Sequence, residues 1–158
     1  MIGGTMLFRQ SSFNSTDSGF TGLFQSYEAV SVTRGTADNE DKIRNTAIEL
    51  YNEGDFVQAG NLLDAIIETG EASQLIRVYA GACALQNGDP DKGIRYLSDW
   101  DPTEPTYIDA QWFLAGCYLD KNERGSALAI LEDLVKNESF KKYSYPAEKL
   151  IRKLHRQQ

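Results

Sequence analysis

Residues 88–100 read GDPDKGIRYLSDW, and the same pattern stands once earlier and once later in the chain, at the same interval. Residues 54–66 read GDFVQAGNLLDAI, and residues 122–134 read NERGSALAILEDL. Each stretch has a small residue at its sixth place: Ala59, Gly93 and Ala127. Each has a leucine four places later: Leu63, Leu97 and Leu131. Self-similarity at a fixed period of this kind indicates a stacked helical array.

The residue types around each copy of the pattern predict a helix, a tight turn and a second helix. Glycine adopts the left-handed backbone that ends many helices, which suits Gly54 and Gly88. Aspartate caps the start of a helix, which suits Asp55 and Asp89, and proline is tolerated in a first turn, which suits Pro90. Small residues also recur on the expected first helices: Ala47, Gly81 and Ala115. We expect these small residues to let paired helices approach each other closely.

Three helix pairs fit between residues 40 and 141. Their expected bounds are about 40–73, 74–107 and 108–141. Thr106 and Asp109 have the spacing of a helix-capping signal, so we expect them to open the third pair.

A terminal capping helix is expected over about residues 145–156, with Ser144 as its cap and Pro146 in its first turn. Apolar residues recur on one of its faces: Ala147, Leu150, Ile151 and Leu154. Basic residues cover the other face: Lys149, Arg152, Lys153 and Arg156. This pattern predicts a helix that closes the end of the array against water. The alternative use of the basic face is contact with an anionic partner or lipid.

The spacing of small and large residues resembles the tetratricopeptide repeat (TPR), a helix pair whose period is about 34 residues. The first copy carries Ile43, Ala47, Leu50, Ala59, Leu63 and Ile66. The second carries Arg77, Gly81, Ala84, Gly93, Leu97, Trp100 and Pro105. The third carries Gln111, Leu114, Ala115, Tyr118, Ala127, Leu131 and Leu134. The opening tryptophan of the family is absent, because Ile43, Arg77 and Gln111 stand there. The resemblance implies an all-α fold, an α-α superhelix whose first helices line a concave groove and whose second helices form the convex back.

A narrower resemblance rests on four short segments: Phe24-x-x-Tyr27, Arg34-Gly35, residues 78–81 (VYAG) and residues 111–119 (QWFLAGCYL). They are similar to segments of small membrane-anchored TPR proteins from Bacteroidetes-type bacteria. This resemblance implies a domain on the extracytoplasmic side of the inner membrane, tethered through a segment before Met1. The apolar residues 1–9 then read as the end of that anchor. The alternative is an ordinary apolar N-terminus and a cytoplasmic location.

The chain divides into residues 1–39, a polar linker or extended segment, and residues 40–158, the TPR domain. An apolar string nevertheless runs through the linker: Phe20, Leu23, Phe24, Tyr27, Val30 and Val32. Apolar side chains are buried where a surface allows it. We therefore expect residues 20–33 to cover part of the groove, either in the same chain or by self-association between two chains.

The groove residues that we expect to contact a partner are Arg44, Tyr51, Val78, Tyr79, Trp112, Phe113 and Leu119. TPR proteins that hold acidic C-terminal tails use lysine, asparagine and arginine in this groove, whereas only Arg44 and Asn45 stand there in this chain. An apolar floor favours a hydrophobic peptide or protein segment, held by burial of roughly 25 cal/mol per Å². In the alternative interpretation, Trp112 and Tyr79 simply pack between neighbouring helices.

Composition excludes several kinds of partner and site. The net charge of the 158 residues is −7, with −12 over residues 1–140 and +5 over residues 141–158, which argues against a nucleic-acid partner. Two cysteines and one histidine are too few for a zinc site. Cys83 and Cys117 are expected at equivalent places in adjacent units, buried and too far apart for a disulfide.

No nucleophile elbow, phosphate loop or HExxH spacing occurs in the sequence, and we expect neither catalysis nor a cofactor. The expected function is a non-catalytic protein-interaction module or scaffold at the bacterial cell envelope. One alternative is a cytoplasmic co-chaperone or assembly factor. Another is a subunit of an enzyme complex, either non-catalytic or contributing residues such as His155 or Asp109 to a shared site.

Overall fold

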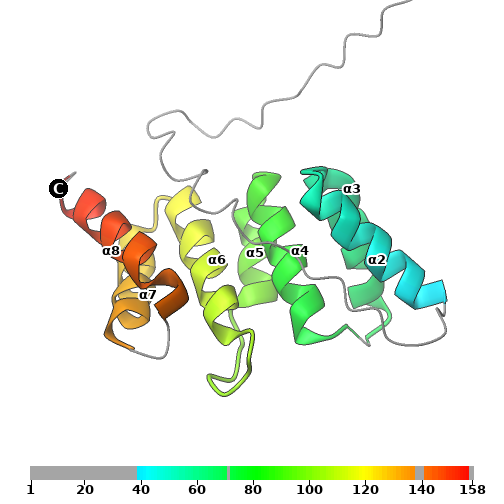
Figure 1. Cartoon of the computed structure of the whole chain (residues 1–158). Helices are drawn as coiled ribbons and strands as arrows, with labels where there is room; N and C mark the ends of the chain where they lie inside the picture. Colours follow the sequence, from blue (N-terminus) through cyan, green and yellow to red (C-terminus); the bar gives the residue numbers. More distant parts are fainter. Residues whose placement is uncertain (1–38, 71, 138–140, 157–158) are drawn as a thin grey trace, which may run out of the picture.

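The computed structural model describes residues 39–70, 72–137 and 141–156, and every regular element in these ranges is an α-helix. The helices are α2 (Asn39–Asn52), α3 (Phe56–Glu68), α4 (Gln74–Gln86), α5 (Pro90–Leu97), α6 (Tyr107–Asp120), α7 (Arg124–Lys136) and α8 (Lys141–Arg156). Consecutive helices pack against one another from α2 to α8, and Figure 1 shows α2 and α3 at one end and α8 at the other. The expected all-α fold is confirmed for these residues. The apolar string over residues 20–33 lies outside them.

The same turn joins three pairs of helices in the described chain. Its left-handed residue is Gly54 (φ +82°), Gly88 (φ +73°) or Asn122 (φ +60°). In each turn the N–H of that residue donates to a carbonyl three residues back, and the next N–H donates to a carbonyl five residues back, at 2.8–3.1 Å. These two bonds define the Schellman motif. The expected left-handed helix ends at Gly54 and Gly88 are confirmed, and Asn122 keeps the geometry without glycine.

The helix after each of these turns begins at the same place in the pattern, at Phe56, Pro90 and Arg124. Asp55 accepts a hydrogen bond from the backbone N–H of Gln58 at 3.0 Å, and Asp89 accepts one from Lys92 at 3.1 Å. Both expected N-caps are therefore confirmed. Glu123 makes no side-chain capping bond, so the third turn lacks this support.

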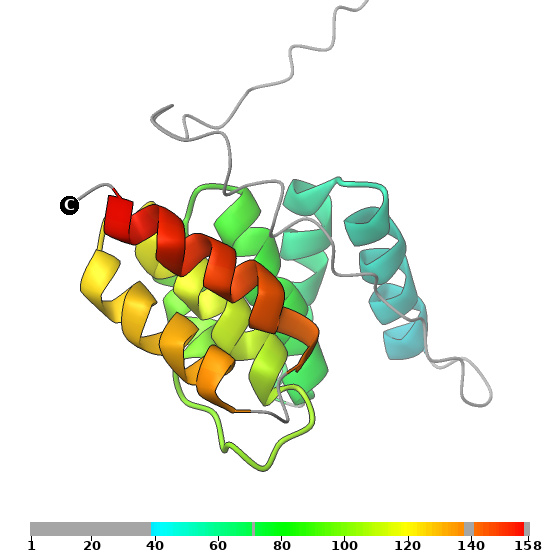
Figure 2. The same cartoon turned by 60° about the vertical axis from the view of Figure 1, so that its left-hand side comes forward.

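The helices are arranged in two rows (Figures 1 and 2). Helices α3, α5 and α7 each pack between the helices that precede and follow them. Helix α4 packs in addition against α2 and α6. The first helices α2, α4 and α6 therefore lie side by side, and the second helices α3, α5 and α7 form the other row.

Small residues allow the close contacts between the rows. A Cβ atom added to Gly81 would lie 2.5 Å from Cγ of Leu97, inside the distance that real Cβ atoms keep. The alanines at the related places are fully buried: Ala47, Ala59, Ala115 and Ala127. The expectation that small residues bring paired helices together is confirmed at these positions.

Two local expectations differ from the structure. Thr106 is the N-cap residue of α6, so the third pair opens where the sequence predicts, but its side chain makes no capping hydrogen bond, and its Oγ1 is buried without a partner. Helix α8 begins at Lys141 rather than near residue 145, so that Ser144 and Pro146 lie inside it. The physical reason is Tyr143, whose buried ring and hydroxyl contact α6 and hold the residues before Ser144 in the helix.

None of the described helices has both the length and the apolar character needed to span a bilayer.

Candidate functional site

The structure places most of the expected groove residues in the interior. The buried ones are at most 5% exposed: Tyr51, Val78, Tyr79, Trp112 and Phe113. Arg44 and Leu119 are half-buried. All of these residues belong to the first-helix row, as the sequence predicted, and the aromatic ones contact other aromatic rings or neighbouring helices.

Tyr51 links the first two helix pairs. Its ring centroid lies 5.2 Å from that of Tyr79 on α4 and 5.4 Å from that of Phe56 on α3, both in edge-on geometry. Burial raises the pKa of the Tyr51 hydroxyl well above its ordinary value, and the Cys83 thiol adds to the effect. Tyr51 is therefore a neutral packing residue that fixes α2 and α3 against α4.

Trp112 joins α6 to the terminal helix. Its ring stacks on that of Tyr143, with centroids 4.8 Å apart and an interplanar angle of 10°. The Tyr143 hydroxyl donates to Oδ1 of Asp109 at 2.6 Å, and Nζ of Lys142 donates to the same oxygen at 2.7 Å. The buried carboxylate of Asp109 is thus paired with the ammonium of Lys142 and hydrogen-bonded by Tyr143, both on α8. Sequence reasoning missed this role of Asp109, because its partners lie a full unit further along the chain.

Burial is distributed differently over the two rows. On α4 the buried residues run without interruption from Val78 to Leu85, and on α6 from Trp112 to Cys117, so both helices are buried around their whole circumference. Helices α3, α5 and α7 instead bury one narrow stripe each. A helix buried all round has neighbours on every side.

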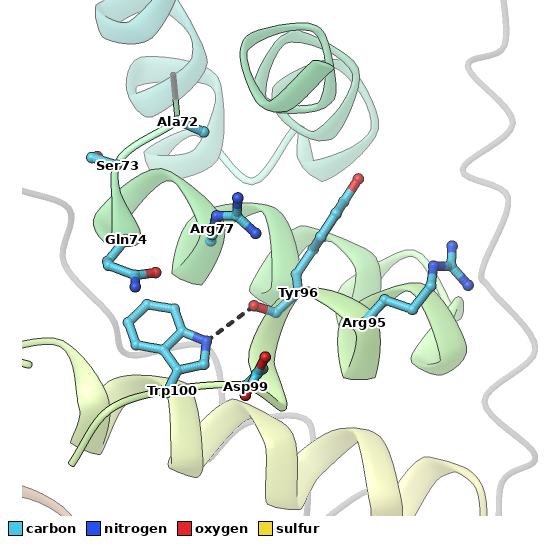
Figure 3. A pocket seen from close by; sticks show the side chains of 8 residues that line it. All are labelled: Ala72, Ser73, Gln74, Arg77, Arg95, Tyr96, Asp99 and Trp100. Atoms are coloured by element: carbon cyan, nitrogen blue, oxygen red, sulfur yellow. Dashed lines mark hydrogen bonds between the residues drawn. The ribbon is translucent and has the colours of Figure 1, made fainter. Parts of the chain in front are cut away.

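A cavity of about 330 Å³ lies beside this row, between the start of α4 and the end of α5. Its lining residues are Ala72, Ser73, Gln74, Arg77, Arg95, Tyr96, Asp99 and Trp100. Figure 3 shows these side chains around the cavity, with Arg77 on α4 and Tyr96 on α5. The indole N–H of Trp100 donates to the carbonyl oxygen of Tyr96 at 3.1 Å, which holds the ring in place.

Cation pairing around the cavity is uneven. Asp64 on α3 accepts hydrogen bonds from Nζ of Lys92 and, at 2.9 Å, from the hydroxyl of Tyr96. Among the residues that the structure describes, neither Arg77 nor Arg95 has a carboxylate oxygen within 4.0 Å of its guanidinium. The described lining of the cavity therefore contains two arginines and one carboxylate, that of Asp99.

The described residues contain no group of three or more histidine, cysteine, aspartate or glutamate side chains that could hold a metal ion. Cys83 and Cys117 are free and buried, as the sequence predicted. Burial raises the pKa of each thiol to about 12. Asp109 is engaged with α8, and His155 is exposed near the end of that helix.

No family model, curated protein or solved structure matches this chain.

Proposed function

We propose that this chain is a TPR-like, non-catalytic protein-interaction module that binds an extended apolar segment along the row of α2, α4 and α6. Residues 20–33 of the same chain are its first occupant, and a partner segment of similar character competes with them. The proposed place at the extracytoplasmic side of the inner membrane rests on the sequence resemblance alone.

The recurrence of the turn supports the repeat interpretation. The left-handed residues Gly54, Gly88 and Asn122 follow one another at a constant interval, and the hydrogen bonds around them are the same. A unit that repeats in this way buries its apolar face against its neighbours and leaves one continuous surface along each row. Such surfaces serve to hold extended partners.

The apolar side of α4 is the observation that carries the binding proposal. Helix α4 packs against α2 and α6 within the row and against α3 and α5 in the other row. Val78, Ala82 and Leu85 share one side of α4, because they are spaced four and three residues apart. All three are apolar, with at most 6% of each exposed. A row whose middle helix has such an apolar side suits an apolar partner segment.

The test uses the full chain with Phe24→Ser and Tyr27→Ser, which weaken the internal occupant. A fluorescent peptide of residues 18–35 then stands in for a partner segment, and its anisotropy is measured against protein concentration. We expect saturable binding with a Kd on the order of 10 µM, since the peptide offers several large apolar side chains.

Two controls give this test its meaning. Leu119→Arg places a charge at a half-buried position of the first-helix row and should abolish binding, whereas Ala129→Arg places the same charge on the exposed side of α7 and should leave it unchanged. Circular dichroism establishes that each variant is folded. Equal affinity for both variants, or equal binding of a scrambled peptide, would contradict the proposal.

A further inference from the structure

The cavity beside α4 arises where the second unit departs from the other two. Arg77 stands at the place that Ile43 and Gln111 take in the other units, and Trp100 stands at the place of Ile66 and Leu134. Both unusual side chains line the same cavity, one from α4 and one from the segment after α5. Figure 3 shows both side chains at this cavity, together with Tyr96. A cavity lined by an arginine and a tryptophan at these places is therefore special to this unit.

Within the described residues, the cations near this cavity differ in their pairing. Asp64, the nearby carboxylate of α3, is already paired with Lys92 and hydrogen-bonded by Tyr96. Arg77 is half-buried, and neither it nor Arg95 forms an ion pair with a described residue. The lining of the cavity holds two arginines, Arg77 and Arg95, against the one carboxylate of Asp99. An arginine whose guanidinium lines a cavity is a strong donor for a carboxylate.

Size restricts what the cavity can hold. Pockets for whole ligands span roughly 300–1,000 Å³, and 330 Å³ lies at the lower limit of that range. A dinucleotide or a similar coenzyme is too large, whereas one side chain or one chain end fits. The Trp100 ring offers a surface on which an apolar or aromatic group can lie.

We propose that this cavity binds a peptide carboxylate next to an apolar or aromatic side chain, with Arg77 holding the carboxylate and Trp100 the apolar group. The carboxylate comes from the end of a partner chain or from an acidic side chain. This site takes Arg77 from the start of α4 and Trp100 from the segment after α5, and it does not depend on the function proposed for the row of α2, α4 and α6.

The experiment uses the full chain labelled with ¹⁵N and three small probes. N-acetyl-phenylalanine has a terminal carboxylate, its amide is the neutral match, and N-acetyl-Phe-Asp-amide has the carboxylate on a side chain. Binding is followed by the indole N–H signal of Trp100, assigned with Trp100→Phe. We expect a Kd of about 1 mM for at least one acid and no saturable shift for the neutral amide. The tighter of the two acids identifies the source of the carboxylate.

Variants then test the role assigned to Arg77. Arg77→Gln should weaken binding of the acid about tenfold, because it removes the charged donor. Lys149→Gln makes the same charge change on the exposed face of α8 and should leave the Kd unchanged. In the unsubstituted chain, raising NaCl from 50 to 500 mM should weaken the acid several-fold. Equal binding of acid and amide, no effect of salt, or a folded Arg77→Gln variant of unchanged affinity would overturn the proposal.

Discussion

A Cβ atom added to Gly93 would lie 2.5 Å from Sγ of Cys117, so α5 and α6 meet without room for a side chain at this point. The carbonyl oxygen of Gly81 on α4 lies 3.4 Å from the same position. Gly93 therefore sits where three helices converge. The small residue of the sequence pattern is therefore required by contacts with the first helix of its own unit, α4, and with α6 of the next unit.

Replacing Gly93 with alanine should destabilise the fold by about 1–2 kcal/mol. Forcing a methyl group into a packed contact costs typically 1–3 kcal/mol, and the higher helix propensity of alanine offsets part of that cost. Urea denaturation measures the change in the free energy of unfolding. Gly125→Ala is the matched control, because its Cβ would meet nothing within 4 Å, and it should be neutral or stabilising. Adding Cys117→Ala to Gly93→Ala should recover part of the loss.

Local features of the fold were predictable from the sequence because they depend on residues close together in the chain. The turns at Gly54 and Gly88 and the caps at Asp55 and Asp89 are of this kind. The partner of Asp109 was not predictable, since Tyr143 reaches it only after α7 and α8 have folded back.

The candidate site was only partly predictable. The repeat period predicted that Tyr79 and Trp112 lie in the first-helix row, but it did not predict which rings they contact. The cavity was missed although a signal for it existed. Arg77 and Trp100 are both unusual at their places in the pattern, and only the packed structure brings them to one cavity.

Tyr143→Phe should destabilise the protein by about 1–3 kcal/mol, because it removes a hydroxyl that donates to the buried carboxylate of Asp109 at 2.6 Å. The stacking on Trp112 is retained, so the effect reports the hydrogen bond. Tyr145→Phe is the control, since Tyr145 is 73% exposed and its change should stay within about 0.5 kcal/mol. Equal urea midpoints for the two variants would show that the bond contributes nothing to stability.

The pKa of Asp91 should lie below its ordinary value of 3.8, because the Lys121 ammonium donates a hydrogen bond to its Oδ1 at 2.7 Å and adds a charge interaction. A carboxyl whose pKa is lowered on folding stabilises the protein above its unfolded pKa. That contribution is lost as the pH falls through the folded value, hence below about pH 4. Carboxyl ¹³C NMR titration measures the shift.

Lys121→Gln should return the pKa of Asp91 toward 3.8. Asp101 serves as the internal control, because its lowered pKa comes from hydrogen bonds donated by the backbone N–H and hydroxyl of Thr103. An unchanged Asp91 titration in this variant would mean that another group sets its pKa.

Both thiols should be inert in the folded protein. Burial raises the pKa of Cys83 and Cys117 from 9.0 to about 12, so the reactive thiolate is scarce at pH 8 and the sulfur is inaccessible. A thiol-specific chromogenic reagent should react slowly with the native chain and quickly in guanidinium chloride. Because the unfolded thiols ionise first, stability should fall as the pH rises above about 9. Rapid reaction of either thiol in the native chain would contradict its burial.

Restoring the Gly-Asp pair in the third turn should stabilise the fold. Asn122 holds a left-handed backbone at φ +60°, which glycine adopts without strain, and Glu123 makes no capping bond where aspartate does so in the other two turns. Asn122→Gly with Glu123→Asp should therefore raise the free energy of unfolding by about 1–2 kcal/mol, measured by urea denaturation. The reverse exchange, Gly88→Asn with Asp89→Glu, should lower it by a similar amount. If the Gly-Asp substitution lowers the free energy of unfolding instead, then the contacts that Asn122 and Glu123 now make stabilise the turn more than the Gly-Asp pair does. Those contacts are the Lys121–Glu123 ion pair at 3.1 Å and the hydrogen bond from Arg124 to Asn122 at 3.3 Å.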